Sequence, residues 1–338
     1  MKFRRNTFMM GLLLSACGLM AGCSVIDDDL TDCYDNNKYD MFYQLRLVTN
    51  MTTELQTELT TIPELGAASS LKTHLKDIFS DFAHDVDLSF YDTEGTLERL
   101  QHDQHIMDAN QSSYALTLPM RKYKHLAVAN ITNNDVVELA DDETCNSSQL
   151  LQADAVEGVI SSHTTGLFTA RQPMEVLEGI DQTFNVRLYM ANSAVSLILN
   201  PKGHKFKDVK VYATGFAKAF YINDSTYVYT DNPPLVLAQQ LETGNDLLCF
   251  CTVNFPSRDE TTRAAENPTL WQFMVYLTEP DGTVTRTVLN ISKPLKAGDL
   301  KIIKGELDDK GSVRPYDSTV GVSVQLDWSS GSEYESPL

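Results

Sequence analysis

A strict alternation of apolar and polar residues near the C-terminus constrains this chain more than any other feature of its sequence. In "TVGVSVQLDW" every second residue is apolar: Val320, Val322, Val324, Leu326 and Trp328. Successive side chains of a β-strand point to opposite faces, so this period predicts a strand that buries one face. The segment "LWQFMVYLT" repeats the pattern with Trp271 on its apolar face. Both tryptophans are therefore expected in the core.

The same alternation predicts strands along most of the chain. They fall at 42–49, 86–92, 114–120, 125–131, 184–190, 195–199, 208–213, 247–255 and 271–277. Pro280 and Gly282 predict a hairpin turn after the last of these strands. The alternation changes phase between Leu188 and Val195, which predicts a bulge or bend there.

Helical spacing is found in few places. Residues 67–83 carry an apolar stripe behind a serine suited to capping, and a second short helix is expected near 148–160. Many strands with few helices predict an all-β fold built of stacked sandwiches. A boundary before residue 183 gives two parts of about 150 residues, a usual domain size. The predicted division is a signal peptide at 1–22, an acidic tether at 23–38, and sandwiches at 39–182 and 183–338.

The first residues have the three parts of a secretory signal. Lys2, Arg4 and Arg5 precede an apolar stretch at 8–21 that is too short to span a bilayer. The following "LMAGC" resembles a bacterial lipobox, which would make Cys23 the lipidated first residue of the mature chain. The run "DDD" after it resembles the acidic export signal of surface lipoproteins in Bacteroidetes-type bacteria. We therefore expect a lipid-anchored protein on the outer face of the outer membrane.

The charge balance excludes one class of partner. Loss of residues 1–22 removes three positive charges and takes the formal net charge from −19 to −22. Nucleic-acid binding needs clusters of Lys and Arg to contact phosphates, and no such cluster is present in the sequence. No nucleic-acid partner is expected.

The cysteines suggest at most one disulfide. Cys249 and Cys251 would share one face of a strand, too far apart to bond, and are expected in the core. Cys33 and Cys145 form the candidate pair in a compartment that permits disulfides. No C-x-x-C spacing points to a metal site, so no metal is expected.

No segment carries a catalytic signature. His102 and His105 are three residues apart in a strand or turn, where their side chains would face opposite ways. Nucleophile-elbow, zinc-protease, Walker and dinucleotide motifs are all absent from the sequence. We therefore expect no catalytic residue and no cofactor. Two "DST" tripeptides, at 224–226 and 317–319, resemble an O-glycosylation signal, with Ser225 and Ser318 as the acceptors.

Several stretches together resemble a known family. The lipobox with "IDDDLTDC" and "FYQLRLVT", the middle stretch "FNVRLYMANSAVSLILN", and the end "KAGDLKIIKGELDDKGSV" with "VGVSVQLDWSSG" are similar to fimbrial anchor lipoproteins of the FimB type. The resemblance implies two tandem transthyretin-like β-sandwiches, and the short helix expected at 67–83 would belong to the first. It also implies a non-enzymatic anchor that tethers a fimbrium to the outer membrane and limits its length. Its partners would be fimbrial shaft subunits, contacted through a strand or sheet edge.

Two further expectations concern assembly. Shaft subunits of such fimbriae are cut after an arginine, which opens a groove for a donor strand. Here the first mature arginine, Arg46, falls inside a predicted strand, so trimming is not expected at this strand. The segment 319–338 is the expected contact with the first shaft subunit, while the lipidated end faces the membrane. The alternative function is a surface glycan-binding lipoprotein, which would present exposed aromatic side chains.

Overall fold

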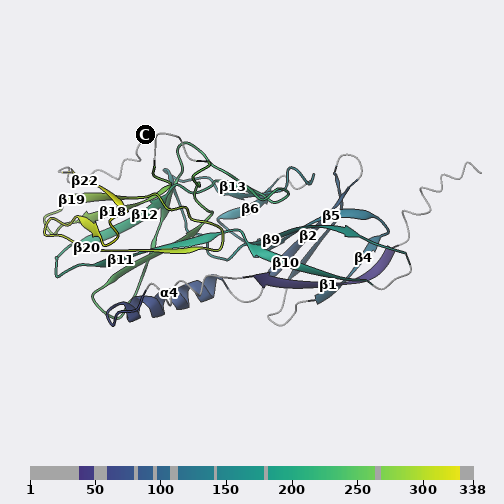
Figure 1. The fold of residues 1–338 in the computed structure, drawn as a ribbon, viewed down its shortest axis with the longest axis horizontal. Helices are drawn as coiled ribbons and strands as arrows, with labels where there is room; N and C mark the ends of the chain where they lie inside the picture. Colours follow the sequence, from purple (N-terminus) through teal and green to yellow (C-terminus); the bar gives the residue numbers. More distant parts are fainter. Residues whose placement is uncertain are drawn as a thin grey trace, which may run out of the picture.

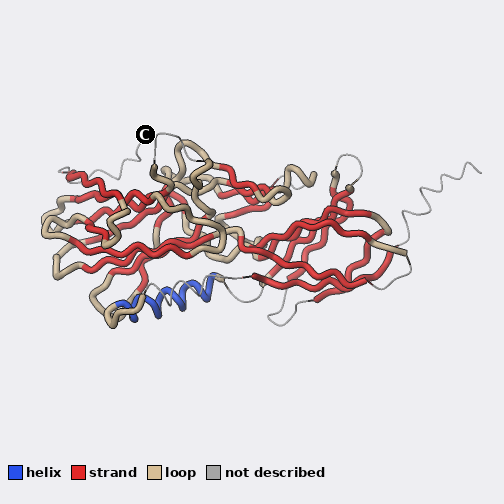
Figure 2. Tube along the Cα trace, viewed as in Figure 1, coloured by secondary structure: helices blue, strands red, loops and turns tan. Residues whose placement is uncertain are grey.

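The chain folds into an elongated molecule built almost entirely of strands (Figure 1, Figure 2). The computed structural model describes residues 38–48, 59–79, 83–93, 97–106, 113–140, 143–178, 182–262 and 268–327. Within these ranges α4 (Glu64–Ile78) is the single helix, and no helix is long and apolar enough to cross a bilayer. The predicted all-β class is confirmed.

The first sandwich is a seven-stranded sheet folded over on itself. Its strands run in the order β3 (Arg99–Ile106), β2 (Asp85–Asp92), β5 (Lys122–Ala129), β9 (Phe168–Glu175), β10 (Gln182–Met190), β1 (Lys38–Val48) and β4 (Ser113–Pro119). β9 and β10 pair only at their ends, where Tyr189 meets Thr169 and Met190 meets Phe168. The sheet therefore divides there into layers of four and three strands, with apolar side chains of both layers in one core.

Strand β1 lies inside the three-stranded layer. It runs parallel to β10 and antiparallel to β4. Its Tyr43 side chain is fully buried, and the hydroxyl contacts the imidazole of His125 on β5 in the opposite layer. Nδ1 of His125 donates to the carbonyl of Ser89 at 3.0 Å, so the bare Nε2 accepts from Tyr43. This buried pair fixes β1 to the facing layer.

The second sandwich has two facing sheets. One contains β22 (Gly321–Asp327), β19 (Val284–Ile291), β18 (Trp271–Thr278), β12 (Asp208–Thr214), β15 (Leu235–Leu237) and β8 (Val159–Ile160). The other contains β16 (Gln239–Leu241), β17 (Leu248–Asn254), β11 (Ser193–Asn200), β20 (Leu300–Leu307) and β21 (Val313–Pro315). A core of aliphatic and aromatic side chains, with Trp271 at its centre, fills the space between them.

Helix α4 covers the outer face of the five-stranded sheet. Its buried stripe of Ala67, Leu71 and Leu75 shares one core cluster with Cys249 and Cys251. The contact is close, because a Cβ added to Gly66 would stand 2.2 Å from the carbonyl oxygen of Thr243. The predicted helix is confirmed, but it begins at Glu64 after Pro63 with no side-chain cap, so the serine expected to cap it lies inside the helix. Although the chain reaches it before β2, it packs on the second sandwich.

The prediction of a short helix near 148–160 is wrong. This segment forms no helix: it contains β7 (Gln149–Gln152) and β8. β7 joins a third sheet with β14 (Thr226–Val228), β13 (Ala219–Tyr221) and β6 (Val137–Ala140). Pairing with β13 and β6 overrides the local helical spacing, because backbone hydrogen bonds to two neighbours outweigh a weak propensity.

The phase change after Leu188 marks the passage between the two sandwiches. β10 ends at Met190 in the first sandwich, and β11 begins at Ser193 in the second. The chain crosses at Ala191 and Asn192, whereas the boundary predicted at 182/183 would place β10 in the second sandwich. The break separates two strands of different sheets, so each keeps its own buried face.

Candidate functional site

The alternating strand near the C-terminus forms one edge of the second sandwich. β22 pairs with β19 and ends the six-stranded sheet. Val322 lies opposite Leu289, and Val324 lies opposite Thr287. Both partners are buried on the inner face of the sheet. Because directly opposite residues share a face, the two valines also point toward the inside of the sandwich.

These inward-facing valines are nevertheless exposed. Val322 is 42% exposed and Val324 is 49% exposed, whereas Val320 is 7% exposed. The prediction that this face would be buried along the strand is therefore wrong for Val322 and Val324. The facing sheet ends in β21, which is three residues long and does not extend over them. Trp328, the last residue of the predicted face, lies outside the described residues.

The uncovered corner forms a groove of 590 Å³ between β21 and β22. Its apolar floor consists of Val313, Pro315, Val320, Val322 and Val324. An apolar strip beside a sheet edge is the surface that a further β-strand needs, because the edge supplies backbone hydrogen bonds and the strip accepts alternate side chains. The corner has room for one more strand than the described chain supplies.

The rim of the groove is polar and rigid. Oδ1 of Asp308 accepts the amides of Lys310 at 2.9 Å and Ser312 at 3.0 Å. On the other side, Asp317 contacts Lys293 Nζ at 3.0 Å. Hydrogen bonds from the backbone amide and the hydroxyl of Thr319, together with Lys293, lower the pKa of Asp317 to about 2. The rim thus stays charged at neutral pH, with both signs present.

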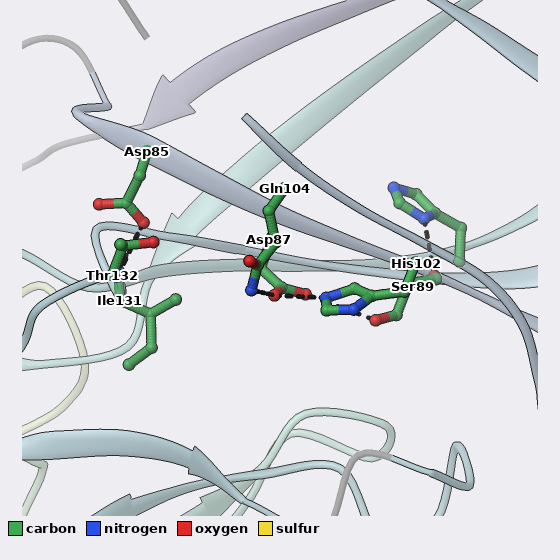
Figure 3. Close-up of polar contacts among 8 residues, drawn as sticks. Asp85, Asp87, Ser89, His102, Gln104, Ile131 and Thr132 are labelled. Atoms are coloured by element: carbon green, nitrogen blue, oxygen red, sulfur yellow. Dashed lines mark hydrogen bonds and ion pairs between the residues drawn. The ribbon is translucent and has the colours of Figure 1, made fainter. Parts of the chain in front are cut away.

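A second polar cluster lies on the outer face of β2 and β3 (Figure 3). Oδ2 of the buried Asp87 accepts hydrogen bonds from His102 Nε2 at 2.6 Å and Gln104 Nε2 at 2.9 Å. Ser89 Oγ lies 3.4 Å from the other carboxylate oxygen. The carboxylate lies between the imidazole and the hydroxyl. A serine nucleophile is activated only when the imidazole lies between the hydroxyl and the carboxylate, so this cluster is not a catalytic triad. The cluster secures β3 to β2.

The other histidine of this segment faces away. His102 pairs with Ser89 and His105 with Val86, and these β2 residues lie on opposite faces. The expected divergence of the two imidazoles is confirmed. Among the described residues, no group of three His, Cys, Asp or Glu side chains is placed to hold a metal ion. No sequence pattern pointed to Asp87, because it becomes a partner of His102 only through the pairing of β2 with β3.

The structure describes three of the cysteines, Cys145, Cys249 and Cys251, and all three are buried. Cys249 and Cys251 are buried and unbonded, as predicted, and burial raises the pKa of the Cys249 thiol to about 11. Cys145 is also buried, with Sγ 3.4 Å from Oδ1 of Asn223. Its proposed partner Cys33 lies outside the described residues, as does Cys23. The disulfide and the lipidation stay predictions.

The two "DST" tripeptides share one hydrogen bond between the aspartate side chain and the backbone. In each, the aspartate Oδ1 accepts the amide of the threonine two residues later, at 3.1 Å for Asp224 and 2.9 Å for Asp317. The serines between them, Ser225 and Ser318, are exposed. O-glycosylation of both serines stays a prediction, and Ser318 also borders the groove.

Trp271 bears on the alternative function. It is 1% exposed, and its Nε1 donates to the carbonyl of Lys293 at 2.9 Å. Its predicted place in the core is confirmed. Trp271 therefore offers no platform on which a sugar ring can stack.

Comparison with known proteins agrees with this architecture. The profile of the family described as fimbrillin-A associated anchor proteins Mfa1 and Mfa2 matches residues 62–329. The chain belongs to this family. No curated protein sequence matches it.

Several solved structures are similar to this chain at low sequence identity. A candidate adhesin from Bacteroides ovatus is 12% identical, with a TM-score of 0.55 over 86% of this chain and 96% of the other. A candidate polysaccharide-binding protein from Bacteroides thetaiotaomicron is 13% identical, with a TM-score of 0.51 over 83% and 97%. The fimbrial anchor protein Mfa2 from Porphyromonas gingivalis is 9% identical, with a TM-score of 0.45 over 85% and 99%.

Proposed function

We propose that this chain is a non-enzymatic subunit that anchors a fimbrium to the outer membrane. Membership of the anchor family supports this function, together with the lipobox at Cys23. In this role the chain needs one attachment to the membrane and one to the fimbrium. The lipid supplies the first, and the groove between β21 and β22 supplies the second. Occupation of the groove by a single shaft subunit would also limit the length of the fimbrium.

The exposure of inward-facing valines carries the proposal for the groove. An apolar strip left open beside a sheet edge is an aggregation hazard unless a partner covers it. A strand of the first shaft subunit fits this space, because it would pair with β22 and place side chains on Val322 and Val324. Strand β22, which lines the groove, and the N-terminal strand β1 lie in opposite halves of the molecule (Figure 1). The shaft would therefore attach at the end remote from the lipid.

Charged substitutions in the groove should release fimbriae. We expect the pair Val322→Asp and Val324→Asp to weaken attachment tenfold or more, since about 1.4 kcal/mol of lost binding is tenfold. The measurement compares fimbrial protein on cells with that shed into the medium. Stability should change little, because both side chains are already exposed in the unoccupied groove.

A matched pair of variants separates the groove from surface charge in general. Val156 is 77% exposed and Leu237 is 45% exposed, and neither lines the groove. Val156→Asp with Leu237→Asp should leave attachment unchanged. Equal shedding by both pairs, or normal retention by the groove pair, would place the docking surface elsewhere.

The membrane attachment has its own prediction. Cys23→Ser should release the chain from outer membranes that have been washed at high salt, because the acyl chains supply the stable anchorage. Fractionation followed by immunoblotting measures this release. Retention of the variant after the wash would show that Cys23 is not the point of attachment.

A further inference from the structure

Two pairs of like-charged residues lie along one long edge of the molecule. Arg46 of β1 stands directly opposite Arg187 of β10, and both side chains are exposed. Lys72 and Lys76 are exposed and one helical turn apart on α4. Figure 1 shows α4 and β1 one after the other along the same edge. We call these four side chains the basic edge.

The fold turns all four outward. α4 directs Ala67, Leu71 and Leu75 into the second sandwich, so Lys72 and Lys76 lie on the opposite side of the helix. β1 buries Met41 and Tyr43, which leaves the even-numbered Arg46 on the outer face of the sheet.

Each pair is unfavourable for folding. Like charges directly opposite on neighbouring strands repel, and so do like charges four residues apart on a helix. In the described part of the chain, no carboxylate forms an ion pair with any of the four. Other basic side chains do find carboxylates, for example Lys304 with Glu64 at 3.1 Å.

This arrangement is unexpected in so acidic a chain. The sequence has 46 acidic and 27 basic residues, so carboxylates are in excess. Local features that work against the fold are expected at functional surfaces, where a ligand compensates for them. The ligand that compensates for unpaired Lys and Arg side chains is an anionic one, and guanidinium groups suit phosphate.

We infer that the basic edge contacts the phosphate groups of an anionic lipid surface. This inference rests on the proposed lipidation. β1 begins at Lys38, 15 residues after Cys23, a tether that spans at most about 50 Å, so the first sandwich is held near the bilayer. An anionic surface repels the rest of the acidic chain and attracts this edge, which orients the molecule.

Two aromatic side chains on the same outer faces fit this partner. Phe42 on β1 is 58% exposed and Tyr189 on β10 is 55% exposed. Tyrosine is enriched at the boundary between lipid and water, where its hydroxyl stays hydrated, and the apolar ring of a phenylalanine beside it adds contact with the acyl chains. With the edge against the membrane, the long axis lies along the surface and the groove at the far end stays accessible to the shaft.

The test uses the mature chain with Cys23→Ser, so that acyl chains cannot mask the contact. It should sediment with vesicles of phosphatidylglycerol at low salt and not with vesicles of phosphatidylcholine. A variant with Arg46→Gln, Lys72→Gln, Lys76→Gln and Arg187→Gln should bind at least tenfold more weakly, since each basic residue near an anionic surface contributes about fivefold.

The control variant removes the same charge elsewhere. Lys205→Gln, Lys207→Gln, Lys218→Gln and Lys296→Gln change four exposed lysines outside the basic edge and should bind like the parent chain. Equal weakening by both sets, or no binding of the parent chain to anionic vesicles, would overturn the inference. Unchanged vesicle binding by the basic-edge variant, with loss of fimbriae from cells, would also overturn it and assign the edge to an acidic protein partner. The groove and Cys23 variants test the proposed function separately.

Discussion

Replacing Trp271 with alanine should lower the free energy of unfolding by about 3–5 kcal/mol. The indole is 1% exposed and lies against Phe273, with ring centroids 5.4 Å apart. Its removal leaves a cavity between the two sheets of the second sandwich. It also leaves the carbonyl of Lys293 without the indole N–H at 2.9 Å. Urea denaturation of the full chain measures the loss.

An exposed aromatic residue provides the control. Tyr316 is 55% exposed, so Tyr316→Ala should change stability by less than about 1 kcal/mol. A Trp271→Ala variant as stable as the Tyr316→Ala variant would show that the second sandwich has no tightly packed core at this position.

Trp271→Ala should also alter the rim of the groove. Lys293, whose carbonyl accepts the indole N–H, also holds Asp317 on the groove rim through its ammonium group. A variant that stays folded at low temperature should therefore retain fewer fimbriae than Tyr316→Ala. This second readout links the packing of the core to the shape of the docking surface.

The alternation of apolar and polar residues predicted the fold class and the main strands. A strand buried on one face requires this alternation within its own sequence. The same rule explains the error at 322 and 324. A strand's sequence records which face points inward, while exposure depends on how far the facing sheet extends. β21 stops after three residues. No residue within "TVGVSVQLDW" carries that information, so the groove could not be predicted from this stretch.

Long-range pairing decides the remaining features. Segment 149–152 has helical spacing, and it becomes a strand because β13 and β6 pair with it. Arg46 and Arg187 are far apart in sequence and become neighbours only through the parallel register of β1 and β10. Asp87 likewise meets His102 through the β2–β3 register. Parallel pairing leaves no turn signal in the sequence, so the arginine pair of the basic edge could not be predicted from it.

Acidification from pH 7 to pH 5 should destabilise the protein by about 4 kcal/mol through two buried histidines. Burial lowers the pKa of His125 to about 4 and that of His163 to about 3. Each has a pKa of about 6.5 in the unfolded chain. Above pH 6.5 both states are neutral and the histidines contribute nothing to the pH dependence. Below it the unfolded chain binds protons that the folded chain excludes, so stability falls until the folded pKa is reached.

Each histidine should contribute about 2 kcal/mol at pH 5. The carboxylates whose pKa is lowest, Asp259 and Asp317 at about 2, titrate below this window and so do not add to the loss between pH 7 and pH 5. Urea denaturation at pH 7, 6 and 5 measures the slope. His163→Leu should remove half of the dependence on pH, because His163 is one of the two contributors. The substitution should leave the fold intact, because the contact of His163 Nδ1 with Asn192 is a long one at 3.4 Å.

The exposed His84 gives the matched control for the acid response. His84→Gln should leave the dependence on pH as it is in the parent chain, while the stability at pH 7 stays within about 0.5 kcal/mol. A parent chain whose stability is flat between pH 7 and 5 would show that His125 and His163 take up protons in the folded state. The hydrogen bond between Tyr43 and His125 Nε2 would then reverse its direction, because the protonated Nε2 donates and the phenolic oxygen of Tyr43 accepts.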